Sequence, residues 1–574
     1  MFIAINKVIL LIVMMFFSVF SLGEPRTIYI DNERGNNKNT GLEKNQAYKS
    51  IRYGLKKMQP GDEMFIISNG PSKPYREKFT ITLSGTGDIY STISGDHEKG
   101  GSYIVGSIDL SAKNKSNKWR VNPDGTWSLL ESPNIKSLWM ASEKQWESGG
   151  VTGLEKLAKA SNKNNIKAAE WYYEKKGKHL LYRPVAEQML DKMHFEGVFH
   201  NKNITINNGN NLNLQHINIA FSTKTSVMVF GNSRNIIFRD FTLKHAANNG
   251  ILFSDGGNIV IERCTMSDIG NSGIKFRGSK TNKISNTVVR DCNISHVKGN
   301  SALTYHKSSD YLDIGDNHLV ENNILFSCGE EGLDITSGSG FVVRNNTTYD
   351  NYEAALVVGH KAKDIVIENH LSVYDGRKKG AIKINYSQNV QLKNSLVFSG
   401  LRYQVLLHGN DGFYSEGNRF VAGKDSRGPL VKIETSSRNN HFNNNYFSNQ
   451  LQNKQQPLLL LDVALVEDKI NGKKVGFPAL VASDTLGAAF ENNIWSVRDK
   501  KYKAFYNNTL ASSFSTFEEA KGFLSKDNLT SISNINREGD VFYLSAEDRL
   551  KFGSSLPNFS KRWQQIEADL TALR

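Results

Sequence analysis

Two consecutive stretches decide the fold of this chain: NIIFRDFTLKHAANNGILFS at 235–254 and NIVIERCTMSDIGNSGIKFRG at 258–278. Each stretch starts with a β-branched strand, passes a polar turn and an apolar pair, and ends after a second polar turn in a short strand. A recurring period of this kind is typical of a solenoid, in which stacked units bury a core that one unit cannot bury alone. The same order returns roughly every 23 to 30 residues, at 318–338, 341–360, 364–385 and 389–410.

Apolar and polar residues alternate within each repeat, so the sequence predicts strands and an all-β fold, a parallel β-helix with one repeat per coil. Four asparagines share one repeat position, and we expect them to stack at the inner bend and to hydrogen-bond along the ladder. They are Asn322, Asn345, Asn369 and Asn394, with Asp291 in the same position below them. Cys264 and Cys292 fall on neighbouring coils, and both a disulfide bond and a reduced buried pair remain open.

The β-helix domain is expected over residues 24–450. Residues 28–66 have the order strand, Gly/Asn-rich turn, short amphipathic helix and strand, which resembles the N-terminal cap of right-handed parallel β-helix carbohydrate enzymes. An insertion at about 116–186 interrupts the repeat, and WYYEKKGKHLLYRPV at 171–185 predicts a hairpin within it. Residues 451–574 should hold the last coils and a C-terminal region of helices and loops.

The first 23 residues, MFIAINKVILLIVMMFFSVFSLG, have one lysine, an apolar core and small residues at the end, as in a secretory signal peptide. We expect a secreted or periplasmic protein with no stable membrane anchor after cleavage, an uncleaved anchor being the alternative. The formal net charge of +14 favours a polyanionic partner. Because an exported protein is a poor candidate for binding genomic nucleic acid, the predicted partner is an acidic polysaccharide, bound by a monomer.

Side chains alternate along a strand, so in GIKFR at 273–277 Ile274 and Phe276 should face the core while Lys275 and Arg277 face outward. Aligning the other short strands in the same way gives two outward columns. The first column reads Leu252, Lys275, Thr304, Asp334, Val357 and Lys383. The second column reads Ser254, Arg277, His306, Thr336, Gly359 and Asn385. With coils about 4.8 Å apart, the acid of the first column should lie about 10 Å from the lysine on either side.

An acidic turn meets this outward face at Glu330, Glu331 and Asp334. Carboxylates this close raise one another's pKa or hold a cation, and their hard oxygen atoms suit Ca²⁺. Calcium is therefore the predicted cofactor, and a solvated acidic turn is the alternative. Basic residues surround the turn, so we expect a groove that binds a polyuronate chain. The candidate substrate-binding residues are Lys275, Arg277, Asn385, Arg402, Tyr403 and His408.

EEGLDITSGSGFVVRNNTTYDN at 330–351 resembles the family 9 polysaccharide lyases, which are parallel β-helix pectate lyases with a DDGLDL-type turn. The resemblance implies that the three acids of this turn bind Ca²⁺ and that a lysine on the following coil removes the proton beside the uronate carboxylate. Val357 stands at that lysine position, and Lys383, in the same column one coil further on, is the nearest substitute. VLLHGNDGFYSEGNRFVAG at 405–423 is similar to the RHG turn of family 6 lyases, which act on alginate and dermatan-type chains, with a leucine in place of the arginine.

β-Elimination on a uronate requires neutralisation of the carboxylate, a base for the proton on carbon five and an acid for the leaving oxygen. We expect calcium to do the first. Lys383 is the predicted base, provided that neighbours such as Arg402 lower its pKa, and His306 is the predicted second base or acid. The predicted function is a secreted polysaccharide lyase. The alternatives are a glycoside hydrolase or uronate epimerase on the same fold, with Asp334 and Glu331 as the hydrolase's carboxylate pair, and a non-catalytic glycan-binding protein.

Overall fold

The computed structural model describes residues 25–278, 283–306, 314–398, 400–434 and 437–449, together with Asn493 and short strands between residues 459 and 533. The predicted signal peptide and most of the predicted C-terminal region lie outside these residues. No helix in the described part of the chain is long and apolar enough to cross a membrane.

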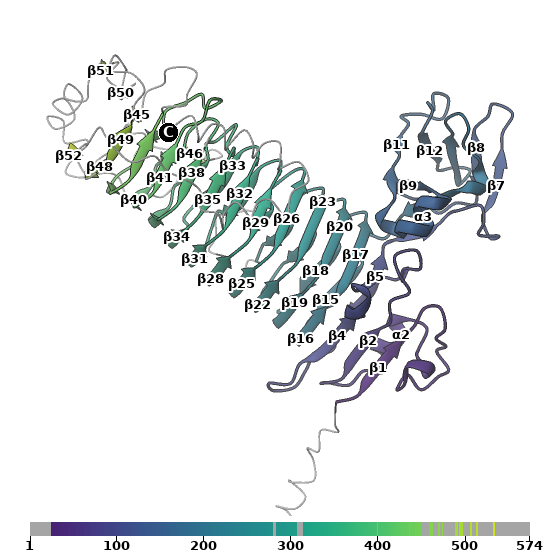
Figure 1. Ribbon diagram of the computed structural model, residues 1–574. Helices are drawn as coiled ribbons and strands as arrows, with labels where there is room; N and C mark the ends of the chain where they lie inside the picture. Colours follow the sequence, from purple (N-terminus) through teal and green to yellow (C-terminus); the bar gives the residue numbers. More distant parts are fainter. Residues whose placement is uncertain are drawn as a thin grey trace, which may run out of the picture.

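Three long sheets run along the described part of the solenoid, and each regular coil contributes one strand to each sheet (Figure 1). Sheet A contains β1 (Thr27–Ile30), β2 (Glu63–Ile66), β4 (Ser91–Gly95), β16 (Asn210–Gln215), β19 (Arg234–Arg239), β22 (Gly256–Glu262), β25 (Ile284–Arg290), β28 (Asp316–Glu321), β31 (Ser339–Arg344), β34 (Lys363–Glu368), β37 (Gln388–Lys393), β40 (Asp411–Glu416), β43 (Asn440–Asn443), β48 (Ala488–Glu491) and β52 (Ile532–Ser533). Sheet B contains β5 (Ser102–Val105), β17 (Ile217–Ser222), β20 (Thr242–Ala246), β23 (Thr265–Ile269), β26 (Asn293–Val297), β29 (Ile324–Phe326), β32 (Thr347–Tyr349), β35 (Leu371–Val373), β38 (Leu396–Phe398), β41 (Arg419–Val421), β44 (Tyr446–Ser448) and β49 (Ile494–Ser496).

Sheet C carries the short strands that were aligned in the sequence. It contains β3 (Phe79–Ile81), β15 (Ile204–Asn207), β18 (Val227–Phe230), β21 (Ile251–Phe253), β24 (Ile274–Phe276), β27 (Leu303–Tyr305), β30 (Glu331–Ile335), β33 (Ala354–Gly359), β36 (Ile382–Asn385), β39 (Val405–His408), β42 (Val431–Glu434), β45 (Leu459–Asp462), β50 (Phe505–Asn507) and β51 (Ser512–Phe514). All strand pairs of the three sheets are parallel except β50 with β51. The predicted parallel β-helix is therefore confirmed.

The interior of the coils is a continuous apolar core built by alternation. In β24, Ile274 and Phe276 are fully buried while Lys275 between them is half-buried and faces outward. Aromatic rings stack from coil to coil, with Phe276 lying 4.8 Å from Phe253 and 4.6 Å from Tyr305 between ring centroids. Burial of one such side chain stabilises the fold by about 1.5–3 kcal/mol, so stacked coils hold one another together.

The asparagine ladder lies one residue away from its predicted position. Asn322, Asn345, Asn369 and Asn394 occupy an exposed turn position with φ between +47° and +56°, which asparagine tolerates better than most residues. The next residue points into the core: Asn323 Nδ2 donates to Asn346 Oδ1 at 2.9 Å, and Asn418 Nδ2 to Asn445 Oδ1 at 3.1 Å. The predicted inner position of the first set was wrong, because a left-handed residue turns the following side chain inward. The predicted hydrogen bonding along the ladder is present between Asn369 Nδ2 and Asn345 Oδ1, at 3.2 Å.

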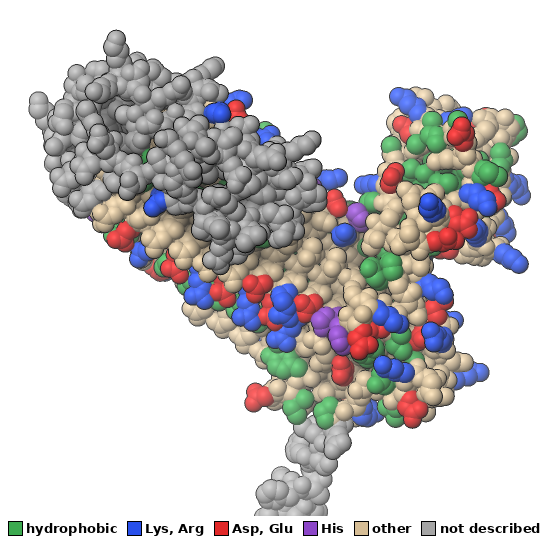
Figure 2. Space-filling view, in the orientation of Figure 1, with side chains coloured by type: hydrophobic (Ala, Val, Ile, Leu, Met, Phe, Trp, Pro, Cys, Tyr) green, Lys and Arg blue, Asp and Glu red, His purple; other side chains and the backbone are tan. Residues whose placement is uncertain are grey.

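The outward ends of the sheet A strands carry a row of alternating charges. The register places Glu262 between Arg239 and Arg290, and Arg290 Nε lies 2.8 Å from Glu262 Oε2. Further along, Arg344 Nη2 lies 2.7 Å from Glu321 Oε2. Basic and acidic side chains follow one edge of the solenoid in Figure 2. The full charge ladder is Arg239, Glu262, Arg290, Glu321, Arg344, Glu368, Lys393 and Glu416.

The N-terminal end is closed by the predicted short helix, α2 (Ile51–Leu55), between β1 and β2. Ser50 caps it by accepting a hydrogen bond from the Tyr53 backbone N–H. Gly54 faces the core so closely that a Cβ there would lie 2.4 Å from Ile30 Cδ1. The helix thus covers the apolar end of the first coils, as the sequence predicted.

An antiparallel unit, the inserted unit, projects beside the cap (Figure 1). Its strands form two small sheets and enclose a core of their own around Trp127, Trp171 and Phe195. The elements are β6 (Ser107–Asp109), β7 (Lys118–Val121), β8 (Trp127–Leu130), β9 (Ser137–Ser142), α3 (Glu143–Gly149), β10 (Glu155–Lys156), β11 (Ala158–Lys159), β12 (Glu170–Glu174), β13 (His179–Arg183) and β14 (Met193–Val198). β12 and β13 pair antiparallel and form the hairpin that the sequence predicts.

The cysteines are free and buried. Cys264 and Cys292 lie on adjacent coils, and burial raises the pKa of the Cys292 thiol well above its usual value. Of the two alternatives left open by the sequence, the structure supports the reduced core pair, in which the thiols act as small apolar side chains.

Candidate functional site

The register of sheet C confirms the predicted first column. Lys275, Thr304, Asp334, Val357 and Lys383 are successive Cα partners across five neighbouring strands. The middle of the column is nearly inaccessible, since Asp334 is 9% exposed and Thr304 and Val357 are less exposed still. The two lysines at its ends are half-buried. The face is therefore a desolvated surface at its centre, which strengthens electrostatic interactions there.

The acidic turn is neutralised by a lysine that the sequence reasoning missed. Glu331 is 3% exposed, and its Oε1 lies 2.7 Å from Lys379 Nζ while its Oε2 accepts a hydrogen bond from Ser301 Oγ at 2.8 Å. Lys379 also forms an ion pair with Glu353. The ammonium group thus joins the carboxylates of two successive coils. This lysine belongs to GRKKG at 376–380, two coils after Cys328. Its pairing with the acidic turn could have been predicted, because the turn before β36 lies beside the turns before β30 and β33.

Asp334 is the most perturbed acid of the face. Burial and the neighbouring Glu331 raise its pKa well above the usual range, against the opposing effects of Lys379 and Lys275. Its Oδ1 is buried and has no hydrogen-bond partner in the described part of the chain. Burial likewise raises the pKa of Glu330. A carboxyl group in this state favours its protonated form and is available as a hydrogen-bond donor.

These contacts do not fit the predicted calcium site at Glu330, Glu331 and Asp334. Lys379 and Ser301 already take up both oxygens of Glu331, and an ammonium group between carboxylates repels a cation. Among the described residues, no three His, Cys, Asp or Glu side chains are arranged to hold a metal ion. The physical reason is that the lysine of the neighbouring coil supplies the charge that the calcium ion was expected to supply.

The two predicted catalytic residues, Lys383 and His306, lie on either side of the acidic turn and share an electrostatic environment. Burial is the main cause of the lowered pKa of Lys383, and the positive charge of Lys379 lowers it further. Burial is also the main cause of the lowered pKa of His306, and the positive charges of Lys275 and Arg277 lower it further. Lowered pKa values favour the neutral, proton-accepting forms of both side chains.

A hydrogen-bonded chain next to Lys383 contains two residues that the sequence reasoning did not select, Tyr386 and Glu434. Tyr386 Oη lies 2.7 Å from His408 Nε2, and His408 Nδ1 lies 2.9 Å from Glu434 Oε1. The register Asn385–His408–Glu434 aligns the chain, and Tyr386 follows Asn385 in a left-handed conformation that turns its ring toward the histidine. Glu434 could have been found by extending the second column two coils further, whereas Tyr386 lies outside that column.

The electrostatics of this chain are set by its acid. Burial alone would raise the pKa of Glu434, but hydrogen bonds from His408 and Lys432 lower it to about 2. An ionised Glu434 keeps a proton on His408 Nδ1 and leaves Nε2 as the acceptor of the phenol proton. His360, on the preceding coil, has its pKa lowered to about 4 by burial and by His306 and Lys383.

Of the remaining predicted substrate-binding residues, Asn385, Arg402 and Tyr403 lie on the coils that carry this chain. Asn385 is buried on β36, where it is the register partner of His408 on the next coil. Arg402 donates from Nη1 to the Lys378 carbonyl oxygen at 2.6 Å, and its guanidinium lies 5.1 Å from the centroid of the Tyr403 ring. Lys432 Nζ lies 5.6 Å from the same centroid. Lys275 and Arg277 lie on the other side of the acidic turn, at His306.

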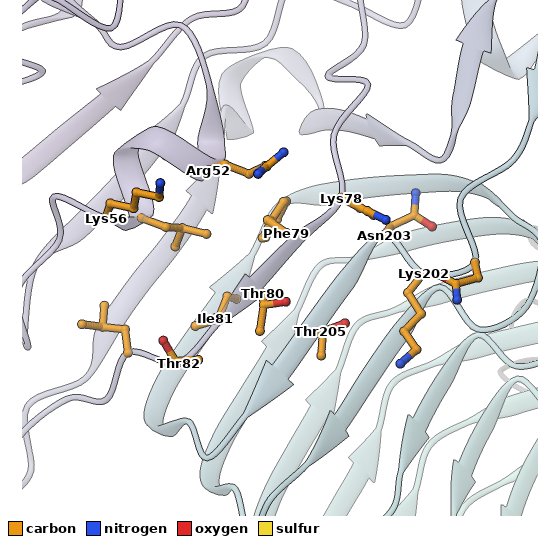
Figure 3. A pocket seen from close by; sticks show the side chains of 13 residues that line it. Arg52, Lys56, Lys78, Phe79, Thr80, Ile81, Thr82, Lys202, Asn203 and Thr205 are labelled. Carbon is orange, nitrogen blue, oxygen red and sulfur yellow. The ribbon is translucent and has the colours of Figure 1, made fainter. Parts of the chain in front are cut away.

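A basic pocket lies at the N-terminal end of the same outward column. Figure 3 shows Thr80 of β3 and Thr205 of β15 side by side, with Lys78 and Lys202 nearby and Arg52 of α2 opposite. The pocket has a volume of about 700 Å³. Six strand-to-strand steps, about 29 Å, separate β3 from β30. The face of sheet C therefore joins a basic end to the acidic turn.

Comparison with known proteins bears on the fold. Residues 202–371 and 285–452 match the family model described as right handed beta helix region. With the three parallel sheets, this match identifies the fold as a right-handed parallel β-helix. No curated protein matches the chain.

Several solved structures are similar to this chain at low identity. A complex of XylC with xylose is 11% identical, with a TM-score of 0.46, and the alignment covers 89% of this chain and 82% of that one. A glycoside hydrolase is 9% identical, with a TM-score of 0.45 and coverage of 83% and 97%. The A-module of the Azotobacter vinelandii mannuronan C-5 epimerase AlgE6 is 15% identical, with a TM-score of 0.42 and coverage of 59% and 91%.

Proposed function

We propose that the chain is a secreted carbohydrate-active enzyme, a polysaccharide lyase that cleaves an acidic, uronate-containing polysaccharide by β-elimination. The observation that carries the proposal is the pairing, on one face of sheet C, of a half-buried lysine of lowered pKa, Lys383, with the chain Tyr386–His408–Glu434. A base of this kind, placed beside a group that can deliver a proton, is what β-elimination requires.

The uronate carboxylate would be neutralised by protein groups. Asp334, held in its protonated form two coils from Lys383, can donate its O–H to the carboxylate of the reacting uronate. Lys275 and Lys432, six strand-to-strand steps or about 29 Å apart in the same column, can bind carboxylates of other units of the polymer. A buried neutral carboxyl group used as a hydrogen-bond donor loses no solvation when the substrate arrives. No step of the proposed reaction passes through a metal.

The proton transfers follow from the positions of the side chains. Lys383, in its neutral form, takes the proton from carbon five, and the electron pair forms the double bond to carbon four. The bond from carbon four to the glycosidic oxygen then breaks. Tyr386 gives its phenol proton to that leaving oxygen and regains one from water after the product leaves, while His408, whose imidazole is oriented by Glu434, holds the phenol in place. His306 remains the second candidate for either proton transfer.

A glycoside hydrolase is the second candidate function, and one observation favours it. Asp334 has a raised pKa, as a general acid needs, and lies within the electrostatic reach of Glu331, a second carboxylate. Pairs of acids with divergent environments are typical of glycoside hydrolysis. A uronate epimerase would use the same proton abstraction as the lyase and return the proton to the opposite face.

The test is incubation of the purified full-length protein with pectate, alginate and glycosaminoglycans, followed by ultraviolet absorbance of unsaturated uronates and by reducing-end assay. The lyase predicts absorbance that rises in step with reducing ends and persists in a chelator. Reducing ends without absorbance would replace the lyase with the hydrolase. Exchange of the carbon-five proton without cleavage would indicate the epimerase, and binding alone would indicate a glycan-binding protein.

A further inference from the structure

A second cluster of reactive side chains lies in the inserted unit, at the N-terminal end of the molecule, away from the face of sheet C. It borders a pocket of about 290 Å³ between the inserted unit and the cap. Ser111, His194, Trp146 and two lysines, Lys113 and Lys192, are among the residues that line it. None of these residues takes part in the proposed lyase reaction.

Strand pairing brings the reactive groups together. β14 pairs antiparallel with β6, with Glu196 opposite Asp109, so Ser111, two residues after Asp109, lies opposite His194. Ser111 Oγ lies 2.7 Å from His194 Nδ1, and His194 Nε2 lies 2.9 Å from Glu196 Oε1. His194 and Glu196 are two residues apart on one strand and therefore share a face.

The hydrogen bonds fix the direction of the chain. Ser111 Oγ accepts a hydrogen bond from the Phe195 backbone N–H at 3.1 Å, so its own proton is available to the imidazole. A carboxylate accepts only, so His194 Nε2 carries the ring proton when the imidazole is neutral. Nδ1 is then the acceptor of the serine proton. This is the tautomer that a histidine needs to act as a base toward a serine hydroxyl.

The third member of the cluster is an ionised, fully buried acid. Glu196 is 0% exposed and forms an ion pair with Arg76 of the cap. Burial alone would raise its pKa, but Arg76 and His194 lower it below its usual value. A charged carboxylate in this position stabilises the imidazolium that forms when the histidine takes a proton.

The imidazole is also held in place from the side. The Trp146 ring stacks on the His194 ring with centroids 3.4 Å apart and planes 11° apart. Trp146 lies on α3, which begins with a complete capping box between Ser142 and Gln145. Stacking and the two hydrogen bonds leave the ring one orientation, as a positioned catalytic base requires.

We propose that Ser111, His194 and Glu196 form the nucleophile, base and orienting acid of a second active centre, a serine esterase that removes small acyl groups from carbohydrate hydroxyls. The geometry of nucleophile, base and acid identifies such a triad independently of fold or chain order. The pocket is at the small end of the usual range for ligand sites, which fits a short acyl group such as acetyl. Lys113 and Lys192 also line the pocket, where both form ion pairs with Glu143.

The reaction balances with water as the only co-substrate. Ser111 Oγ forms a bond to the ester carbonyl carbon while its proton moves to His194 Nδ1. The bond from that carbon to the alkoxy oxygen breaks, and the sugar hydroxyl leaves with the proton from His194. Water then attacks the acyl carbon and gives a proton to His194. The bond from that carbon to Ser111 Oγ breaks, His194 returns the proton to Oγ, and the carboxylic acid is released.

The experiment uses the purified full-length protein, p-nitrophenyl acetate and a fluorophosphonate probe. The expected result is hydrolysis of the ester, covalent labelling of Ser111 located by mass spectrometry, and a loss of hydrolysis of about 10³-fold or more in Ser111→Ala and His194→Ala. Ser132→Ala is the matched control, because Ser132 is a buried serine of the same unit outside the pocket. It should hydrolyse the ester at the wild-type rate.

The labelling experiment uses the wild-type protein, so misfolding of a variant cannot affect its result. Absence of label at Ser111 would overturn the proposal, as would full hydrolysis by Ser111→Ala with an unchanged thermal midpoint. Glu196→Gln should lower hydrolysis and remain folded, since it keeps a hydrogen-bonding side chain beside Arg76. The esterase and the lyase are separable, because Lys383→Ala should leave ester hydrolysis intact.

Discussion

The outward ends of sheet A carry a charged residue on every coil from Arg239 to Glu416, whereas the first column of sheet C carries one on every second coil from Lys275 to Lys383, and the two rows also differ in how their charges are paired. On sheet A, acids and bases alternate, and Glu262 contacts arginines on both sides. On sheet C, one oxygen of Asp334 has no hydrogen-bond partner among the described residues, and Lys383 has a lowered pKa. A solenoid whose ladders pair charges so readily does not need the second arrangement for its stability. Unbalanced groups of this kind are typical of functional sites.

The largest expected effect is the loss of catalysis when the lysine of lowered pKa on sheet C is removed. Lys383→Ala should lower kcat on the uronate substrate by about 10³-fold, since general-base catalysis contributes about 10²–10⁴-fold. Lys393→Ala, which removes a lysine of the charge ladder, is the matched control and should keep kcat within about twofold. The measurement is the initial rate of ultraviolet absorbance. Equal rates for the two variants would show that Lys383 is not the base.

Removal of one phenol oxygen should have the next largest effect. Tyr386→Phe should lower kcat by about 10²-fold, because the ring packs as before while the proton donor is lost. Tyr414→Phe removes the corresponding oxygen from a tyrosine of sheet A and should leave kcat unchanged. A Tyr386→Phe enzyme with wild-type kcat would move the acid role to His306.

Stability should change in opposite directions on the two sheets. Glu262→Gln should cost about 1 kcal/mol of unfolding free energy, because the charge-assisted hydrogen bonds from its two arginines weaken. Asp334→Asn should be neutral or stabilising by about 1 kcal/mol, because it removes a buried carboxyl group that must stay protonated. Urea unfolding of both variants measures the difference.

The pH dependence of Asp334→Asn sharpens that result. The pKa of Asp334 is raised in the folded state, so the unfolded chain loses this proton first as pH rises above about 4. The wild-type protein should therefore lose stability relative to Asp334→Asn as pH rises from 4 toward the raised pKa. A constant difference between the two proteins over this range would contradict the proposed protonation state.

The smallest effect is expected at the basic pocket. Lys78→Ala and Lys202→Ala should raise KM for long polyuronates several-fold, since each removes one positive charge from a site about 29 Å from the acidic turn. KM for oligosaccharides too short to reach the pocket should not change. A uniform increase for both lengths would argue against binding of the polymer along sheet C.

The sequence allowed the fold and the outward columns to be predicted because both follow from local alternation and a fixed period. It placed Asp334 and Lys383 in one outward column correctly, as the register shows. It did not reveal that Lys379 pairs with Glu331, because that contact depends on how turns of different length meet in space. The one-residue error in the asparagine ladder arose from a left-handed turn that has no signal in apolar periodicity.

The inserted unit shows the same limit more strongly. Ser111 and His194 are 83 residues apart, and antiparallel pairing of β6 with β14 brings them together. A repeat-based interpretation discards this region as an interruption. A site made by pairing across an insertion is visible only once the strand order is known.

The charge ladder of sheet A also limits how many coils can be added or removed without disturbing its ion pairs. From Arg239 to Glu416, the ladder residue of each coil is opposite in charge to the ladder residue of the next coil. Deleting or duplicating one coil would bring two like charges opposite each other, which is destabilising. Loss or gain of two coils would restore the alternation. Lengthening or shortening of this solenoid, by design or by descent, should therefore proceed in steps of two coils.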